Sequence, residues 1–571
     1  VSAELSDFES DLVEKYGTAA GQSFNAARVQ QAIEPDEALV VWVEVPDSET
    51  DADPGGDHWA GLLRREGQPV WFKLPGSGPS GAWTSDDREL ARRVHRLLVE
   101  PGNVANAWQN PARELFALRL FPLVDALTST ESLPAVRRLV VLPSLGMDGV
   151  PVETLLAASG RRDYTVSYAP SGTVFAWLRE KRAAEPGRLA RARRSRLLAL
   201  GDPAFPPAEA PFGAEPPEHG AYVALVTPGS NAERHALRSG DVLVTYGGAV
   251  VSSADELGDL IQRRPLPEKA VAENEANDVA LEVWRAGKTM RLTVAAGPLG
   301  VQLDKRSAAD AVRTERQFGD FLRSTRSDAF QPLPGARREV QAIARLFPGA
   351  EMLLGQEAST GRLDELANSG RLGEFDVLHF ATHGQLDQRS PLESALVLSC
   401  TDPPDSREQD LTGDTIYDGR LTAAHIMRLW KLNADLAVLS ACETGLGKYS
   451  GGEGFVGFSQ ALLLAGAQSL VLSQWKVDDT ATALLMVRFY ENLLGKREGL
   501  KGPLSKTEAL AESKRWLREL SADEVEKLVA DLPAVERVGK ATGAPRPAVK
   551  SARPFSHPYY WAAFILIGDP E

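Results

Sequence analysis

Short runs of apolar, often β-branched residues recur along the chain, and between them apolar residues return every three to four positions. The first pattern predicts buried strands and the second predicts amphipathic helices. The predicted strands are Ala38–Val45, Trp59–Leu63, Pro69–Leu74, Arg138–Pro143, Tyr164–Tyr168, Arg196–Leu200, Glu351–Leu354, Asp376–Phe380, Ser394–Ser399, Asp435–Ser440 and Ser469–Trp475. These strands alternate with predicted helices, among them Ala112–Leu127, Ala336–Phe347, Gly454–Leu464 and Asp479–Leu494. The sequence therefore predicts a parallel α/β sheet flanked by helices.

The middle of the chain departs from this pattern. A stretch rich in Pro, Ala and Gly follows Phe205 and predicts a junction between domains. Beyond it, short strands surround one helix, Ala254–Arg263, which is typical of a small, mainly β module. The sequence therefore predicts four parts: a helical segment (1–34), a first α/β half (35–205), the small β module (206–300) and a second α/β half (301–571).

Composition narrows the classes of protein. The 571 residues include 63 Lys and Arg against 78 Asp and Glu, a net charge of −15, which argues against nucleic acid as a direct partner. Two cysteines exclude a disulfide framework and indicate a reducing cytoplasm. The longest apolar runs fall short of the roughly 20 residues that span a bilayer, so we expect no membrane segment. The start at Val1, without Met or a signal-peptide pattern, indicates a piece of a longer protein.

Candidate chemistry lies where two predicted strands end. FDVLHFATHG ends at His383-Gly384, and LAVLSACETG carries Cys442, 442 − 383 = 59 residues further on. The carboxyl ends of strands in open α/β sheets are where active sites gather. A histidine roughly 50 residues before a cysteine is the order of caspase-type thiol proteases.

A thiol is mostly protonated at neutral pH, whereas the thiolate is the nucleophile, so a neighbouring imidazole is the base that this chemistry needs. The small residues Gly384 and Ala441 leave backbone N–H groups able to stabilise an oxyanion. The alternative is a structural cysteine beside a core histidine.

Other histidine and cysteine residues compete for these roles. His379, four residues before His383, is an alternative base or one half of a metal pair, but the sequence favours a core histidine or a neighbour of the site. No further ligand cluster and no HExxH helix accompanies it, so we expect neither a metal nor another cofactor. Cys400 has no accompanying histidine motif and is assigned to packing.

Together, HFATHG, LSACETG, GGEGFVGFSQALLLAGAQSLVLSQWKVDDTAT and HPYYWAAFILIGD resemble the CHAT domain, the bacterial caspase-like peptidases related to separase. The resemblance implies a pseudo-caspase half followed by an active caspase-like half. It implies His383 as general base and Cys442 as nucleophile, with the Gly384 and Cys442 N–H groups as oxyanion donors. It further implies that Asp479 or Asp478 lines an S1 pocket for a basic P1 residue, although Lys476 departs from the acidic residue that separases have there. The alternative for either aspartate is a helix N-cap.

The small module resembles a PDZ domain of the bacterial protease-associated type, through VTPGSNAERHALRSGDVLVTYGGAVVSSADELGDLI and VALEVWRAGKTMRLTV. Such domains bind peptide ends by adding a strand to a sheet edge. The resemblance puts the carboxylate-binding loop at His219-Gly220-Ala221-Tyr222, which departs from the usual Gly-hydrophobic-Gly-hydrophobic form. The alternative is a structural or docking insert without a free ligand.

The expected function is that of a cytoplasmic cysteine endopeptidase, regulated by a partner or by its PDZ-like module. Its expected partners are a protein substrate and an activating protein or peptide C-terminus. Family context adds bacterial signalling or defence, including antiviral defence. The alternative function is a non-catalytic, PDZ-based peptide-binding scaffold, which the His383 and Cys442 pair disfavours. An HtrA-like serine protease is disfavoured because the sequence has no GNSGG-type motif.

Overall fold

In the computed structural model, the chain folds into two units, a large one and a small one. The large unit takes in the described residues of Val1–Ala204, Pro332–Thr401 and Gly419–Glu571, and the small unit those of Phe205–Gln331. The structure describes residues 23–45, 56–100, 106–142, 144–147, 149–161, 163–184, 196–205, 215–227, 229–263, 278–285, 287–314, 330, 333–387, 389–399, 419–441, 449–450, 454–455, 457–534 and 552–571.

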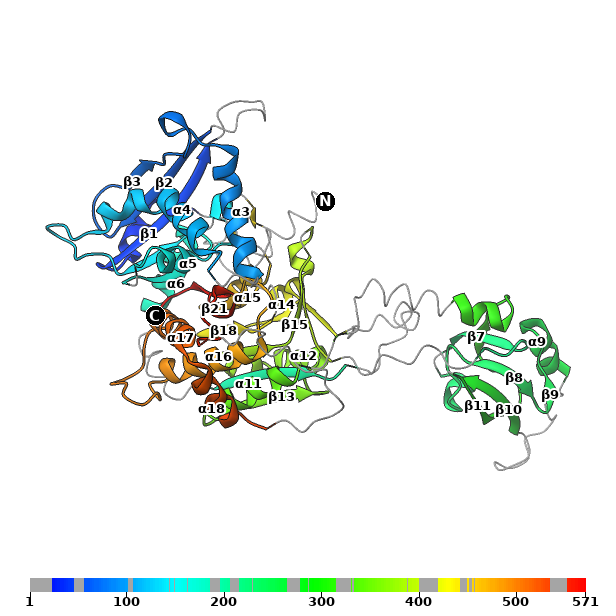
Figure 1. The fold of residues 1–571 in the computed structure, drawn as a ribbon. Helices are drawn as coiled ribbons and strands as arrows, with labels where there is room; N and C mark the ends of the chain where they lie inside the picture. The colour runs from blue at the N-terminus through cyan, green and yellow to red at the C-terminus, as the bar shows by residue number, and fades with distance from the viewer. Residues whose placement is uncertain are drawn as a thin grey trace. The chain divides into compact units, whose positions relative to one another are not determined.

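The large unit is built on an 11-stranded sheet (Figure 1). Its strands, in spatial order, are β13 (Glu351–Gly355), β6 (Leu197–Pro203), β14 (Val377–Ala381), β18 (Leu436–Leu439), β21 (Ser469–Ser473), β22 (Phe564–Gly568), β5 (Thr165–Tyr168), β4 (Arg138–Val141), β1 (Glu37–Val45), β2 (Asp57–Arg64) and β3 (Val70–Lys73). Neighbouring strands are parallel except at β21–β22, β1–β2 and β2–β3. The predicted α/β fold class is confirmed.

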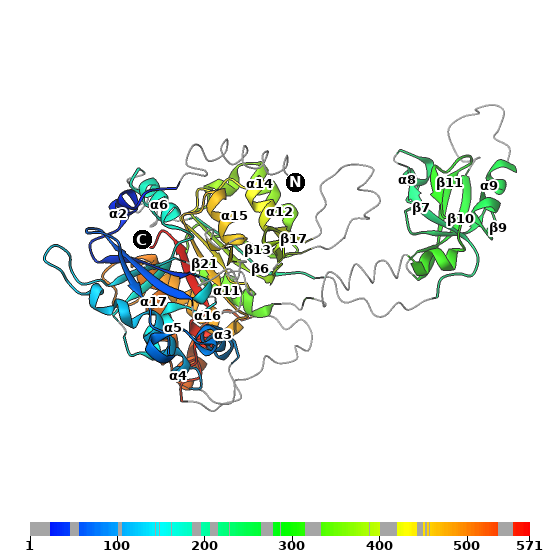
Figure 2. The same ribbon diagram turned by 90° about the horizontal axis from the view of Figure 1, so that it is seen from above.

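Helices cover both faces of this sheet. Around the β6–β14–β18 region, α12, α14 and α15 lie on one face and α11 and α16 on the other (Figure 2). The helices are α2 (Ala26–Ala32), α3 (Ser85–Val99), α4 (Gln109–Arg119), α5 (Val152–Ala158), α6 (Gly172–Ala184), α11 (Pro334–Ala344), α12 (Thr360–Asn368), α14 (Ala423–Leu429), α15 (Phe458–Ala465), α16 (Asp479–Leu493), α17 (Lys506–Glu519), α18 (Ala522–Asp531) and α19 (Pro558–Trp561). Because both faces are covered, the central strands β14, β18, β21 and β22 are buried along their whole length.

Helix boundaries follow local chemistry. The side chains of Thr84 and Ser505 cap α3 and α17 and form reciprocal capping boxes with the third helical residue. The predicted helix Ala112–Leu127 is wrong in its second half, because the α-helix ends at Arg119 and a 3₁₀ helix, Phe121–Leu127, takes over. Pro122 lacks the N–H that would continue the α-helical ladder.

Two further sheets of the large unit are small. One has three strands, β15 (His383–Gln385), β16 (Ala395–Val397) and β17 (Arg420–Thr422), and the other pairs β19 (Tyr449–Ser450) with β20 (Gly454–Phe455). The predicted helix Gly454–Leu464 therefore begins later than expected, at Phe458, after Gly457 with its left-handed φ of 114°.

The small unit is a six-stranded sheet with the helices α8 and α9 and a further helical stretch at residues 308–314. Its spatial order is β11–β10–β8–β7–β12, with β9 paired to β8. The elements are β7 (Ala221–Val226), α8 (Asn231–Arg234), β8 (Val242–Tyr246), β9 (Ala249–Val250), α9 (Ala254–Arg263), β10 (Asp278–Arg285), β11 (Lys288–Ala295) and β12 (Val301–Leu303). The predicted end of this module at residue 300 falls before β12 and before Ala308 and Ala311, which pack against Trp284.

Candidate active site

The two strands that carry the predicted catalytic residues are direct neighbours. β14 and β18 run parallel, with Phe380 opposite Leu439 in the register. The Ser440 N–H donates to the Phe380 carbonyl at 2.7 Å, so the pairing continues one residue beyond β18. The segments that follow both strands therefore leave the sheet at the same edge, as the sequence pattern predicts.

His383 begins β15, two residues after β14 ends. Its backbone pairs with Val397 of β16, its neighbour Gly384 pairs with Leu396, and both residues are half-buried. The Thr382 hydroxyl, itself buried, donates to the Val397 carbonyl. This small sheet holds the His383 backbone in place at the carboxyl edge of the large sheet.

Cys442 lies outside the described residues, as does Cys400. The chain is described up to Ala441, which is buried and whose carbonyl accepts a hydrogen bond from the Ser473 hydroxyl on β21. The position from which the Cys442 segment starts is thus anchored to the third strand in the row β14–β18–β21. The assignment of Cys442 as nucleophile stays a prediction.

The two aspartates that follow β21 have different surroundings. Asp478 is the N-cap of α16, and its Oδ1 accepts hydrogen bonds from the N–H groups of Thr480 at 3.1 Å and Ala481 at 2.9 Å. Asp479 packs against Gly335 of α11, where an added Cβ would lie 2.5 Å from the Asp479 Cβ. Of the two, Asp479 is therefore the aspartate whose carboxylate is not used to cap the helix.

Burial, followed by the charges of Asp478 and Glu339, raises the pKa of Asp479 to about 6, and Lys476 opposes this shift. By its surface, however, Asp479 is an exposed residue in the first turn of α16, so the neighbouring charges of Asp478 and Glu339 are the firmer cause of this shift. With a pKa of about 6, this carboxylate titrates near neutral pH. A shifted pKa is common among functional groups, so Asp479 is the stronger of the two candidates for the S1 pocket.

His379 lies in the core, as the sequence favoured. Its ring is fully buried, with Nε2 at 3.0 Å from Glu339 Oε1 and Nδ1 at 3.2 Å from the Tyr490 hydroxyl. Because both ring nitrogens are occupied within the core, His379 is not placed to serve as base at the sheet edge. Sequence analysis missed Glu339 and Tyr490. The signal was available in part, because Glu339 falls on the apolar face of the amphipathic helix α11, beside Ala336, Val340 and Ile343.

The predicted carboxylate-binding loop of the small unit falls at an interior strand. Ala221 and Tyr222 of β7 pair with β8 on one side, and the Tyr222 carbonyl accepts from the Asp304 N–H, next to β12, on the other. A peptide strand needs an unpaired edge, and β7 has a neighbour on both sides. His219-Gly220-Ala221-Tyr222 thus leads into an interior strand, whereas the outer strands of this sheet are β11 and β12. The placement of the carboxylate-binding loop at these residues stays a prediction.

Within the described ranges, no group of three or more His, Cys, Asp and Glu side chains is arranged to hold a metal ion. Among the described residues, no helix is long and apolar enough to cross a membrane.

The large unit is thus a helix-covered α/β sheet with a histidine just past one central strand and a cysteine predicted just past the next. The chain belongs to the CHAT domain family, whose model matches residues 109–569. This match confirms the resemblance found in the sequence motifs.

Curated relatives share part of the chain. Tetratricopeptide repeat protein 28 of Mus musculus is 27% identical over 263 residues, and that of Homo sapiens is 28% identical over the same length. The match covers 42% of this chain but only 9% and 8% of those proteins, so this chain spans a small fraction of their length.

Solved structures are similar to each part of the chain. The separase chain of the Saccharomyces cerevisiae separase–securin complex is 10% identical, with a TM-score of 0.35, and the match covers 86% of this chain and 29% of that one. The PDZ domain of an SdrC-like protein from Listeria innocua is 16% identical, with a TM-score of 0.13, and the match covers 16% of this chain and 98% of that domain.

Proposed function

We propose that the protein is a cysteine endopeptidase that cleaves a specific protein substrate, with Cys442 as nucleophile and His383 as general base. The observation that carries this proposal is the parallel pairing of β14 with β18, which brings the segments leading to His383 and to Cys442 to one sheet edge. Membership of the CHAT domain family supports the same pairing of roles.

In this mechanism, His383 takes the proton from the Cys442 thiol, and the thiolate attacks the carbonyl carbon of the scissile peptide. The N–H groups of Gly384 and Cys442 stabilise the oxyanion of the tetrahedral intermediate. When the C–N bond breaks, the His383 imidazolium donates its proton to the leaving amine. Water, deprotonated by His383, then hydrolyses the thioester and regenerates the thiol.

Asp479 is proposed to select a basic P1 residue. The other candidate for the S1 pocket, Asp478, already uses its carboxylate to cap the N-terminus of α16. Because the pKa of Asp479 is about 6, its carboxylate is mostly ionised at pH 7 and above, where it attracts a P1 Arg or Lys. The positive charge of Lys476, three residues earlier, repels a basic P1 side chain and so weakens the preference for Arg or Lys.

The small unit is proposed to recruit a regulatory partner. A peptide C-terminus that adds a strand would pair with an outer strand of its sheet, and β12 is the outer strand beside β7. The separase of the similar solved structure is in complex with securin, which gives a precedent for control by a protein partner. We place this activity in the bacterial cytoplasm, in signalling or antiviral defence. The second candidate, a non-catalytic scaffold, relies on the small unit alone.

The test is proteolysis of a peptide library by the wild type, Cys442→Ala and the matched control Cys400→Ala, each with and without candidate activators. We expect the Cys442 variant to lose all cleavage and the Cys400 variant to retain it. Cleavage that survives Cys442→Ala would overturn the assignment. Cleavage that requires an added partner would establish regulation, and the absence of cleavage under every condition would favour the scaffold.

A further inference from the structure

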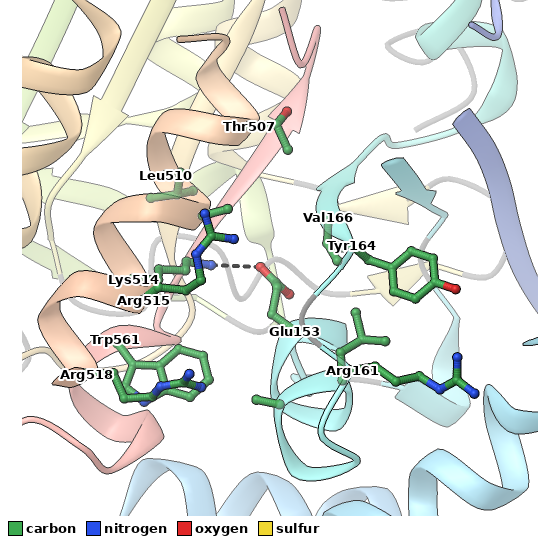
Figure 3. Close-up of a pocket in the computed structure, with 13 residues that line it drawn as sticks. Glu153, Arg161, Tyr164, Val166, Thr507, Leu510, Lys514, Arg515, Arg518 and Trp561 are labelled. Carbon is green, nitrogen blue, oxygen red and sulfur yellow. Dashed lines mark hydrogen bonds and ion pairs between the residues drawn. The ribbon is translucent and has the colours of Figure 1, made fainter. Parts of the chain in front are cut away.

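A small pocket lies in the large unit between α5 and β5 on one side and α17 and α19 on the other (Figure 3). Its volume is about 70 Å³. Leu156, Val166 and Leu510 form apolar parts of its wall, and the rings of Tyr164 and Trp561 lie on opposite sides. The walls of the pocket thus come from two elements of the N-terminal half, α5 and β5, and from two elements near the C-terminus, α17 and α19, and His383 is not among the lining residues.

The only carboxylate among the pocket-lining residues is already engaged. Glu153 Oε1 is 2.7 Å from Lys514 Nζ, a contact drawn in Figure 3, and the Tyr168 hydroxyl donates to Glu153 Oε2 at 2.7 Å. Burial, together with the Glu153 charge, raises the pKa of Tyr168, so this hydroxyl keeps its proton and remains a donor. Lys514 and Glu153 therefore neutralise one another.

Three arginines remain around the same pocket: Arg161, Arg515 and Arg518. Arg518 is partly compensated, because its Nη2 is 3.9 Å from Glu519 Oε1, and it also lies 5.4 Å from the Trp561 ring centre. Among the described residues, neither Arg161 nor Arg515 has an ion-pair partner, so these two carry the uncompensated charge. The whole chain has a net charge of −15, so the positive charge around this pocket is opposite in sign to that of the chain. Like charges around a small pocket repel one another, and an anion bound between them relieves that repulsion.

We infer that this pocket binds a small molecule carrying a phosphoryl group. Guanidinium groups recognise phosphoryl oxygens through paired, charge-assisted hydrogen bonds, and a volume of about 70 Å³ suits one such group rather than a whole nucleotide. The rings of Tyr164 and Trp561 offer contact to an attached planar organic part. Because the walls come from elements far apart in the sequence, the bound ligand stabilises the junction between them.

The test measures binding by calorimetry at constant ionic strength, with inorganic phosphate, phenyl phosphate and chloride as probes. The proteins are the wild type, Arg161→Gln, Arg515→Gln and the control Arg92→Gln, an arginine on α3 whose side chain is 78% exposed. We expect saturable binding of a phosphoryl probe to the wild type, weakened about tenfold in either pocket variant and unchanged in Arg92→Gln. A thermal melt of each variant checks that it folds.

Absence of saturable binding by the wild type up to about 10 mM of either phosphoryl probe overturns the inference. Equal weakening in Arg92→Gln, or equal binding of chloride, overturns it as well, because either result indicates general attraction to positive charge. Tighter binding of phenyl phosphate than of phosphate identifies an organic monoester as the ligand, and equal affinity identifies free phosphate. Peptidase activity is not measured, so this result is independent of the proposed function.

Discussion

At the scale of single residues, Asp479 shows how neighbouring charges give one carboxylate an unusual role. It follows Asp478 in the chain and faces α11, which carries Glu339, so two negative charges oppose its ionisation. Its neighbour Asp478 is held by backbone N–H groups at the helix start. Two adjacent residues of one type therefore divide into a structural cap and a group that titrates near neutrality.

This difference makes a prediction about stability. The pKa of Asp479 is raised from 3.8 to about 6, so the folded state is favoured by the protonated form and loses stability as pH rises from 3.8 through 6. Asp479→Asn, which cannot ionise, should therefore raise the free energy of unfolding relative to the wild type, more at pH 8 than at pH 5. Urea denaturation at both pH values measures this.

The comparison variant is Asp478→Asn, in which Asn is an equally good N-cap. It removes only one of the two charges that oppose ionisation of Asp479, so at pH 8 it should stabilise the fold less than Asp479→Asn does. If the stabilisation by Asp479→Asn is the same at pH 5 and pH 8, its cause is packing against Gly335 rather than charge.

Sequence analysis selected His383 and the two aspartates as candidates because each follows an apolar run, where a strand must end, and their roles stay predictions. It could not tell Asp478 from Asp479, because the choice of N-cap depends on backbone angles at one position. It could not find the Glu339–His379 contact either, since the two residues are brought together only by packing of α11 on β14.

At the scale of elements, that contact ties α11 and α16 to the strand leading to His383. Glu339 comes from α11, His379 from β14 and Tyr490 from α16, and all three are buried. A buried polar cluster of this kind stabilises the fold only while every member keeps its partner. The cluster therefore makes the position of β14 depend on both helices.

Glu339→Ala leaves His379 Nε2 buried without its partner, and we expect a loss of about 3 kcal/mol in the free energy of unfolding. Tyr490→Phe removes one neutral hydrogen bond and should cost about 1 kcal/mol. Arg345→Ala, an exposed position just after the same helix, is the control and should be nearly neutral. Denaturant unfolding measures all three, and a loss after Glu339→Ala no larger than that of the control contradicts a role for the pair.

The strands were predicted well where the apolar run was long, and poorly where it was short. β14, β18 and β21 match their predicted runs closely, because buried parallel strands are apolar throughout. β12 has only three residues, Val301–Leu303, and no pattern of period two can be recognised over that length. For that reason the open edge of the small sheet could not be located from the sequence.

At the scale of the whole chain, the spatial order of the strands differs from their order in sequence, and two of the differences concern strands far apart in the chain. β6 precedes the small unit in the chain yet pairs with β13 and β14, which follow it. β22, the strand nearest the C-terminus, lies between β21 and β5. It therefore joins the group of strands from β13 to β21 to the group from β5 to β3. The apolar run at Tyr559–Ile567 was visible in the sequence, but its central place depends on contacts with strands almost 400 residues earlier.

This topology predicts opposite outcomes for two deletions. The ends of the inserted segment lie close together, since Leu333 N donates to Asp202 Oδ1 at 3.1 Å and the rings of Phe205 and Phe330 are 5.7 Å apart. Replacing residues 206–329 by a short Gly-Ser linker should therefore leave the large unit folded, with a cooperative melt. Removing Phe564–Glu571 deletes a fully buried central strand and should abolish that transition. Thermal unfolding followed by circular dichroism distinguishes the two, and a cooperative melt in the truncated chain would show that β22 is dispensable for joining the halves.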